Sequence, residues 1–215
     1  MINTLGVVPA AGKATRWGGM LKEALPLSET ESFISRTVRA MFAGNADACL
    51  VITSPEKIRS HSEALKRYDV IYRFQSEEGD LWQAIKESFI FNAKWNMFAM
   101  PDTFWPMGVF DSQMFEQDFN IGCFETQKPN RFGILSGGQI IDKPDVAGQY
   151  SAWGVLTWSR HIVNFWLENL SIIDNHTQAF NMAMKEFSFH SIEMPFYHDM
   201  ASFVDYEDFI RAAIH

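Results

Sequence analysis

The chain has 215 residues, of which 47% are hydrophobic, and this is enough to bury the core of one domain. Its net charge of -8, from 26 acidic and 18 basic residues, argues against a nucleic-acid partner, because binding to a phosphate backbone requires a basic surface. No apolar stretch reaches the roughly 18 residues of a membrane helix, and no basic start leads into an apolar signal core. The composition predicts a cytoplasmic protein without a membrane partner.

Strand and helix patterns alternate through the first half of the chain. The predicted strands are short and apolar or β-rich, at residues 5–9, 48–53, 70–74 and 97–100. The segments with helical spacing or polarity lie between them, at residues 32–42, 55–66 and 81–91. Because the strands are apolar on both faces, we expect a doubly wound, mostly parallel Rossmann-like α/β sheet covered by helices on both sides. Ligands should bind at the carboxyl ends of its strands.

The second half has a looser pattern. From about residue 120 there are strand-like pieces, a glycine turn at residues 135–139, and helical segments at 160–170 and 176–185. The chain contains no Pro- or Ser-rich linker and no internal repeat. We therefore expect one domain over residues 1–215, whose second half completes the sheet and builds an acceptor pocket.

The loop after the first predicted strand is rich in cations. Residues 7–27 read VVPAAGKATRWGGMLKEALPL, and they place Lys13, Arg16 and Lys22 close together in a chain that is acidic elsewhere. Such a cluster suits a small anionic ligand. The loop has neither the glycine spacing of a Walker loop, nor the second glycine of the dinucleotide fingerprint, where Ala14 stands.

Small residues at the start of this loop leave its backbone N–H groups approachable. Triphosphate oxygens would lie against Ala10, Ala11 and Gly12, while Arg16 and Lys22 would neutralise their charge. The alternative is a β-turn with two solvated cations.

Here the sequence resembles a known family. Residues 12–16 (GKATR) and 22–27 (KEALPL) look like the G-x-G-T-R and P-K-x-L-L-P signature of the sugar-1-phosphate nucleotidyltransferases. Ala14 replaces the middle glycine and Leu21 the proline. The short spacing between Arg16 and Lys22 is closer to that of the molybdenum-cofactor guanylyltransferases and the methylerythritol-phosphate cytidylyltransferases. The signature therefore indicates the superfamily, but not the molecule that accepts the nucleotidyl group.

Further motifs of the family follow in the same order. Residues 75–84 resemble Q-x-x-x-x-G-x-x-x-A, which implies that Gln75 and Gly79 bind the nucleobase. Residues 101–103 (PDT) resemble the motif that supplies a magnesium ligand, here Asp102. Residues 197–202 (YHDMAS) resemble a degraded W-x-D-x-G-T, whose acid, Asp199, would be the second ligand.

Two motifs concern the acceptor. Residues 141–144 (IDKP) resemble E-K-P, which implies that Asp142 and Lys143 hold a sugar and its phosphate. Trp153 and Gly154 resemble a glycine strand that lines the sugar pocket. We also expect Trp153 and Trp105 at the pocket edge, where they would stack on a sugar or base.

The resemblance implies a Mg²⁺-dependent enzyme that transfers a nucleotidyl group from a nucleoside triphosphate to a sugar 1-phosphate and releases pyrophosphate. Arg16 would hold the pyrophosphate, Lys22 would stabilise charge at the α-phosphate, and Asp102 and Asp199 would bind the metal. The predicted nucleotide-binding residues are Ala10, Ala11, Gly12, Lys13, Gln75 and Gly79. Two alternatives stay open: transfer to a non-sugar acceptor (an alcohol phosphate, phosphocholine or pterin phosphate), and an inactive nucleotide-binding relative.

Several residues also have simpler interpretations. Asp102 is compatible with a helix N-cap, Gln75 with a surface position, and Lys143 with an ordinary turn. Asp205 is the alternative to Asp199 as metal ligand, or else the cap of the last helix. The two cysteines, Cys49 and Cys123, have no paired spacing and are expected to be buried free thiols, and the six histidines show no metal-binding spacing.

Overall fold

The computed structural model describes residues 2–13, 17–18, 20–75 and 79–214, and its centre is a mixed sheet. The continuous path of the sheet has the order β10-β6-β9-β4-β1-β2-β3. Its strands are β1 (Thr4–Pro9), β2 (Ala48–Thr53), β3 (Val70–Phe74), β4 (Trp95–Ala99), β6 (Phe119–Thr126), β9 (Tyr150–Ser159) and β10 (Phe189–Glu193). β4, β1, β2 and β3 are parallel, and β9 is antiparallel to both of its neighbours.

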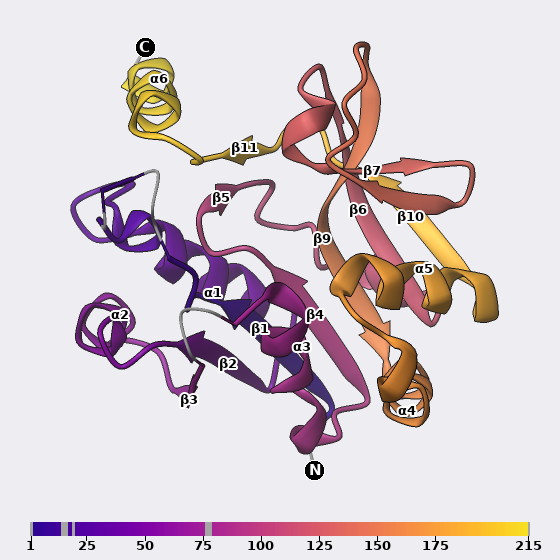
Figure 1. Cartoon of the computed structure of the whole chain (residues 1–215). Helices are drawn as coiled ribbons and strands as arrows, with labels where there is room; N and C mark the ends of the chain where they lie inside the picture. The colour runs from indigo at the N-terminus through magenta and orange to yellow at the C-terminus, as the bar shows by residue number, and fades with distance from the viewer. Residues whose placement is uncertain (1, 14–16, 19, 76–78, 215) are drawn as a thin grey trace.

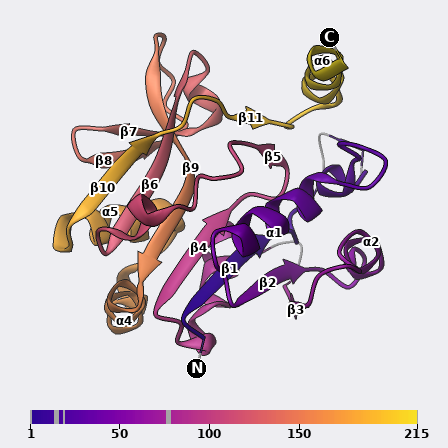
Figure 2. The ribbon, with the colours of Figure 1, turned by 180° about the vertical axis from the view of Figure 1, so that it is seen from behind.

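Helices cover both faces of the sheet (Figures 1 and 2). α1 (Phe33–Ala43) and α2 (Ile58–Ala64) pack on one face, where they share a hydrophobic cluster with Val8 and Val51. α3 (Leu81–Lys86), α4 (Arg160–Glu168) and α5 (His176–Glu186) pack on the other face, against Leu5 and Val7. Successive residues of β1 thus enter different clusters, which confirms a mostly parallel, doubly wound sheet.

The helices begin at the side-chain caps expected for their residue types. The Ser32 hydroxyl accepts from the backbone N–H of Ser35 to start α1, and Asp80 and Asn175 accept in the same way at the starts of α3 and α5. α3 is shorter than the predicted helix 81–91. The Ser88 hydroxyl donates to the Ile85 carbonyl, and the chain continues as a short 3-10 helix, η3 (Phe89–Phe91).

A hairpin and a strap complete the second half. β7 (Gly133–Ser136) and β8 (Gln139–Asp142) form the hairpin, and its turn contains Gly137 and Gly138, both with positive φ. The strap consists of β11 (His198–Asp199), paired antiparallel with β5 (Thr103–Phe104), followed by α6 (Phe203–Ile214). It brings α6 back over the N-terminal half (Figure 1).

The remaining structural predictions concern burial. Cys49 and Cys123 are buried free cysteines, as predicted. Trp105 is fully buried against Phe110, so its predicted place at a pocket edge is wrong. Within the described part of the chain, no helix has the length and apolar character that crossing a membrane requires.

Candidate active site

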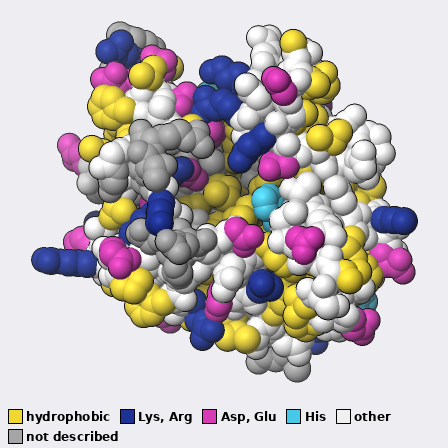
Figure 3. Space-filling view, in the orientation of Figure 1, with side chains coloured by type: hydrophobic (Ala, Val, Ile, Leu, Met, Phe, Trp, Pro, Cys, Tyr) yellow, Lys and Arg dark blue, Asp and Glu magenta, His cyan; other side chains and the backbone are white. Residues whose placement is uncertain are grey.

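Five of the predicted site residues line one cavity of about 390 Å³. They come from elements far apart in the sequence: Lys22, Asp102, Asp142, Lys143 and Asp199. Lys22 begins the 3-10 helix η2 (Lys22–Ala24), and Asp102 follows β4. Figure 3 shows acidic, basic and histidine side chains around a hollow on this face of the molecule. The fold thus brings these five residues to one cavity. Asp102 follows a strand of the parallel part of the sheet, whereas Asp142 and Asp199 end β8 and β11, which are paired antiparallel.

The strap holds Asp102 and Asp199 beside each other. Asp199 pairs with Thr103, the neighbour of Asp102, and the Met200 N–H donates to the Asp102 carbonyl at 3.1 Å. No helix follows Asp102 directly, so the helix-cap interpretation of this residue is wrong. The two aspartates therefore occupy neighbouring backbone positions, and both line the cavity.

Lys22 forms an ion pair with the Asp102 carboxylate. The Asp102 side chain is 6% exposed and the Lys22 side chain 28% exposed, so this pair lies at the inner wall of the cavity. Burial opposes the charged form of Lys22, but Asp102 outweighs it, and the pKa of Lys22 is raised above its ordinary value. The ammonium group is thus protonated, and it is paired with Asp102 and attracted by the charge of Asp199.

The carboxylate of Asp199 is largely buried and lies near charges of both signs. Its pKa is raised, first by burial and then by the neighbouring Asp102 carboxylate, although Arg131 and Lys22 act in the opposite direction. A further positive charge between the two carboxylates would reduce their repulsion.

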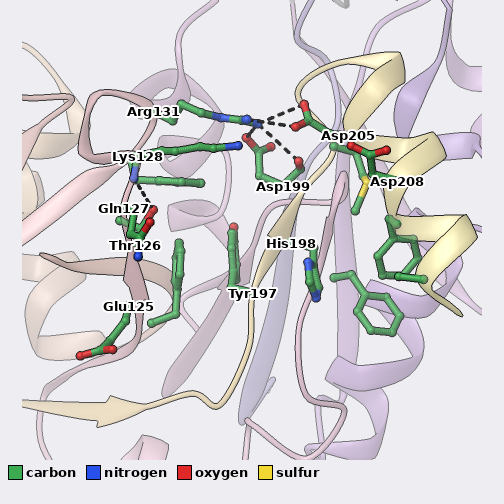
Figure 4. A pocket seen from close by; sticks show the side chains of 16 residues that line it. Glu125, Thr126, Gln127, Lys128, Arg131, Tyr197, His198, Asp199, Asp205 and Asp208 are labelled. Atoms are coloured by element: carbon green, nitrogen blue, oxygen red, sulfur yellow. Dashed lines mark hydrogen bonds and ion pairs between the residues drawn. The ribbon is translucent and has the colours of Figure 1, made fainter. Parts of the chain in front are cut away.

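Arg131 is a site residue that the sequence did not indicate. Its guanidinium donates to Asp199 Oδ2 at 2.8 Å and to Asp205 Oδ1 at 3.0 Å (Figure 4). Asp205 also accepts from the Ser202 hydroxyl at 2.7 Å, within the start of α6. Asp205 lines the neighbouring pocket of about 650 Å³ and is not among the residues that line the 390 Å³ cavity. It joins the strap to Arg131.

The predicted acceptor residues also line the cavity. Asp142 ends β8, and Lys143 has a φ of 44° and donates its backbone N–H to the Phe132 carbonyl at 2.9 Å. Trp153 and His176 line the cavity too, and their ring centroids are 6.4 Å apart. Burial lowers the pKa of His176 despite the nearby Asp142, so its ring is neutral near pH 7.

Gly154 does not line the cavity but lies beneath one of its walls. A Cβ at this position would be 2.6 Å from the Tyr197 ring, and Tyr197 is a lining residue. The glycine therefore permits Tyr197 to pack against β9.

Gln75 and Gly79 contact each other outside the cavity lining. Gln75 is buried, so the surface interpretation is wrong, and its amide donates to the Asp80 carbonyl at 2.9 Å. A Cβ on Gly79 would lie 2.1 Å from the Gln75 amide nitrogen. The glycine is thus required for the present position of Gln75 at the end of β3.

The predicted phosphate loop is described only in part. Ala10 and Ala11 are buried after β1, whereas Gly12 and Lys13 are exposed. Arg16 lies outside the described residues.

Behind this loop lies a buried polar network that the sequence also did not indicate. The Glu23 carboxylate is 2.9 Å from the Lys57 ammonium and 3.1 Å from His61 Nε2, and His61 Nδ1 is 2.8 Å from the Thr53 hydroxyl. Burial raises the pKa of Glu23, but hydrogen bonding from His61 and the charge of Lys57 outweigh it, and the pKa lies below the ordinary 4.5. Glu23 is therefore ionised at neutral pH.

This network predicts a pH dependence of stability. Because the pKa of Glu23 is lower in the folded state, its stabilising contribution is present above the ordinary pKa of 4.5 and is lost as the pH falls through the folded-state value. We expect Glu23→Gln to lower the free energy of unfolding by about 3–5 kcal/mol at neutral pH, since Lys57 loses its buried partner. Urea denaturation should show this difference narrowing below pH 4.5. A difference that stays constant down to pH 3 would contradict the assignment, and Glu63→Gln, at an exposed position, is the control.

No family model matches the sequence, and no curated protein matches it. Among solved structures, the chain is similar to a protein from Bacillus anthracis described as a "Putative Glucose-1-Phosphate Thymidylyltransferase", solved in complex with sucrose. The TM-score is 0.83, the alignment covers 98% of this chain and 95% of that one, and 17% of the residues are identical. The likeness shows that the chain shares the Rossmann-like α/β fold of that protein.

Proposed function

We propose that the protein is a Mg²⁺-dependent nucleotidyltransferase that joins a nucleotidyl group to a sugar 1-phosphate. The observation that carries the proposal is the lining of the 390 Å³ cavity, which contains the Lys22–Asp102 ion pair, Asp199, and the predicted acceptor residues Asp142 and Lys143. A cavity with a cationic group beside paired acids, and a second lysine within it, suits two phosphate-bearing substrates that react with each other.

The residues present fit magnesium. Within residues 2–13, 17–18, 20–75 and 79–214, no group of three or more His, Cys, Asp or Glu side chains is arranged to hold a metal ion. Magnesium, however, commonly binds one or two carboxylates, and takes its other ligands from water and substrate phosphates. Asp102 and Asp199 form such a pair, because β5 and β11 hold them at neighbouring backbone positions, and repulsion from Asp102 adds to burial in raising the pKa of Asp199. When bound there, the ion would neutralise phosphate charge and orient the reacting oxygens.

In the proposed reaction, an oxygen of the acceptor phosphate attacks the α-phosphorus of the nucleoside triphosphate. The new P–O bond forms as the bond to the β-phosphate breaks, and pyrophosphate leaves with its electron pair. Lys22 would turn from Asp102 to the α-phosphate, where its compact charge stabilises the transition state. The main task of the protein is to position the two substrates and to balance their charge.

The nucleotide would bind along the carboxyl ends of β1 and β3. The backbone of Ala10, Ala11 and Gly12, together with Lys13 and Arg16, would face its phosphates, and Gln75 with Gly79 would contact the base. The first half of the domain is thus the nucleotide side and the second half the acceptor side.

The residues predicted to bind the acceptor are suited to a phosphorylated sugar. The Asp142 carboxylate would accept hydrogen bonds from sugar hydroxyls, and Lys143 would pair with the phosphate. The indole of Trp153 offers an apolar surface to a sugar ring beside the neutral His176. Gly154 contributes indirectly, because its lack of a side chain leaves room for the Tyr197 ring.

A pyrophosphate-release screen tests the proposal. Each of four nucleoside triphosphates is combined with sugar 1-phosphates, alcohol phosphates, phosphocholine and a pterin phosphate in the presence of Mg²⁺. We expect release with at least one sugar 1-phosphate, and none without acceptor or with Mg²⁺ removed by a chelator. Release only with a non-sugar acceptor would overturn the acceptor assignment. Nucleotide binding without release from any pair would favour an inactive nucleotide-binding relative.

A further inference from the structure

Lys57 is not among the residues that line the cavity, and it contacts two described segments, residues 10–12 of the phosphate loop and Glu23 in η2. Its ammonium lies 3.4 Å from the Ala10 carbonyl, 2.5 Å from the Gly12 carbonyl and 2.9 Å from the Glu23 carboxylate. The residue is 4% exposed, immediately before α2. A lysine ammonium has three N–H donors, and here three acceptors surround it.

Glu23 connects this contact to Lys22. The two residues are consecutive in η2 and point in different directions: Lys22 pairs with Asp102 in the cavity, while Glu23 is 2% exposed and is held by Lys57 and His61. A shift of Glu23 would therefore move the backbone that carries Lys22.

The network is also anchored in the sheet. His61 on α2 joins Glu23 to the hydroxyl of Thr53, the last residue of β2. The carboxylate and the Lys57 ammonium balance each other in charge, and all of these side chains are buried. Apolar side chains of similar size would stabilise the fold equally well, whereas charged hydrogen-bonding groups fix direction as well as distance.

We propose that Lys57 is a positioning residue for the nucleotide side of the site. Its ammonium fixes the chain after β1 relative to η2, so that the triphosphate meets an ordered backbone with Lys22 already in place. Lys57 does not line the cavity, so it would act through the backbone and Glu23 and not by contact with a substrate. The inference rests on the proposed function, because it assigns the ordered segments to nucleotide binding.

Two variants separate positioning from stability. Lys57→Met removes the contacts but leaves Glu23 as a buried, unpaired charge, which endangers the fold. The double variant with Lys57→Met and Glu23→Gln contains neither charge, and still lacks the contacts to the Ala10 and Gly12 carbonyls. Lys66→Met is the matched control, because Lys66 is exposed and pairs only with Glu63 among the ion pairs found in the described residues.

We expect the double variant to regain a melting temperature near that of the wild type, while its kcat/KM falls by about 100-fold. The KM for the nucleoside triphosphate should rise, whereas the KM for the acceptor should change little, since Asp142 and Lys143 do not contact the network. A purely structural role would affect both substrates equally or neither. Equal changes in the two KM values, or wild-type kinetics in the double variant, would overturn the proposal.

Hydrogen exchange of the ligand-free protein supplies a test that needs no activity. Backbone amides of residues 10–13 and 20–25 should exchange faster in the double variant than in the wild type. In Lys66→Met, the exchange rates of the same amides should equal those of the wild type. If the wild type transfers no nucleotide to any acceptor, the proposed function fails, and exchange still decides whether Lys57 orders these segments. Unaltered exchange in a stably folded double variant would reject that role.

Discussion

Lys22→Ala should lower kcat by on the order of 100-fold or more, because the lost ammonium would act mainly on charge that develops in the transition state. The structure places this group beside Asp102 and within the same cavity as Lys143. Removing it also leaves the buried Asp102 carboxylate without its cation, so some loss of stability accompanies the loss of activity. Steady-state kinetics at saturating substrates, together with the melting temperature, measure the two effects separately.

The control for this variant is Lys66→Ala. Lys66 is 62% exposed and pairs with Glu63 at the surface, where an ion pair contributes about 0–1 kcal/mol. It should keep wild-type kcat. If Lys22→Ala also keeps wild-type kcat, Lys22 has no part in the reaction.

Asp102→Asn and Asp199→Asn should each raise the Mg²⁺ concentration needed for half-maximal activity by at least about tenfold. Even changes in outer-shell partners of a metal alter affinity by about 10–100-fold, and a direct ligand matters more. The two variants should also differ in their free energy of unfolding. Asp102→Asn deprives Lys22 of its partner, whereas Asp199→Asn removes a carboxylate whose pKa burial and Asp102 already raise.

Asp205→Asn distinguishes the two assignments of the second ligand. Asp205 contacts Arg131 and Ser202 and is not among the residues that line the cavity, so its loss should leave the Mg²⁺ requirement near that of the wild type. A Mg²⁺ titration of the three variants decides the matter. A steep requirement in Asp205→Asn with a normal one in Asp199→Asn would assign the metal to Asp205.

The sequence predicted the fold because its strands are apolar on both faces. Val7 and Val8 illustrate this: both are fully buried, in different hydrophobic clusters, which only helices on both sides of the sheet can provide. The direction of β9 was not predictable, because a buried strand has the same apolar pattern whether it runs parallel or antiparallel to its neighbours.

The candidate site was predictable where each residue follows a strand, as Asp102 does. No local pattern indicated Lys57 or Arg131, because each acts through contacts with residues distant in the chain. Lys57 lies in a polar stretch whose composition is that of a solvated helix, and only the fold shows that it is buried. Buried polar contacts between separate elements have no local pattern, whereas apolar periodicity does.

The strap completes the candidate site through contacts between residues that are far apart in the sequence. β1 to β4 form a sheet from the first half of the chain, but Asp199 lies on β11, which pairs only with β5 in the described structure. The Trp17 indole that donates to the Met200 carbonyl is 183 positions away from it. Contacts of such long range form slowly, because a large loop must close first. A refolding chain should therefore gain most of its secondary structure before Asp199 reaches Asp102, so the candidate site is among the last parts of the molecule to form.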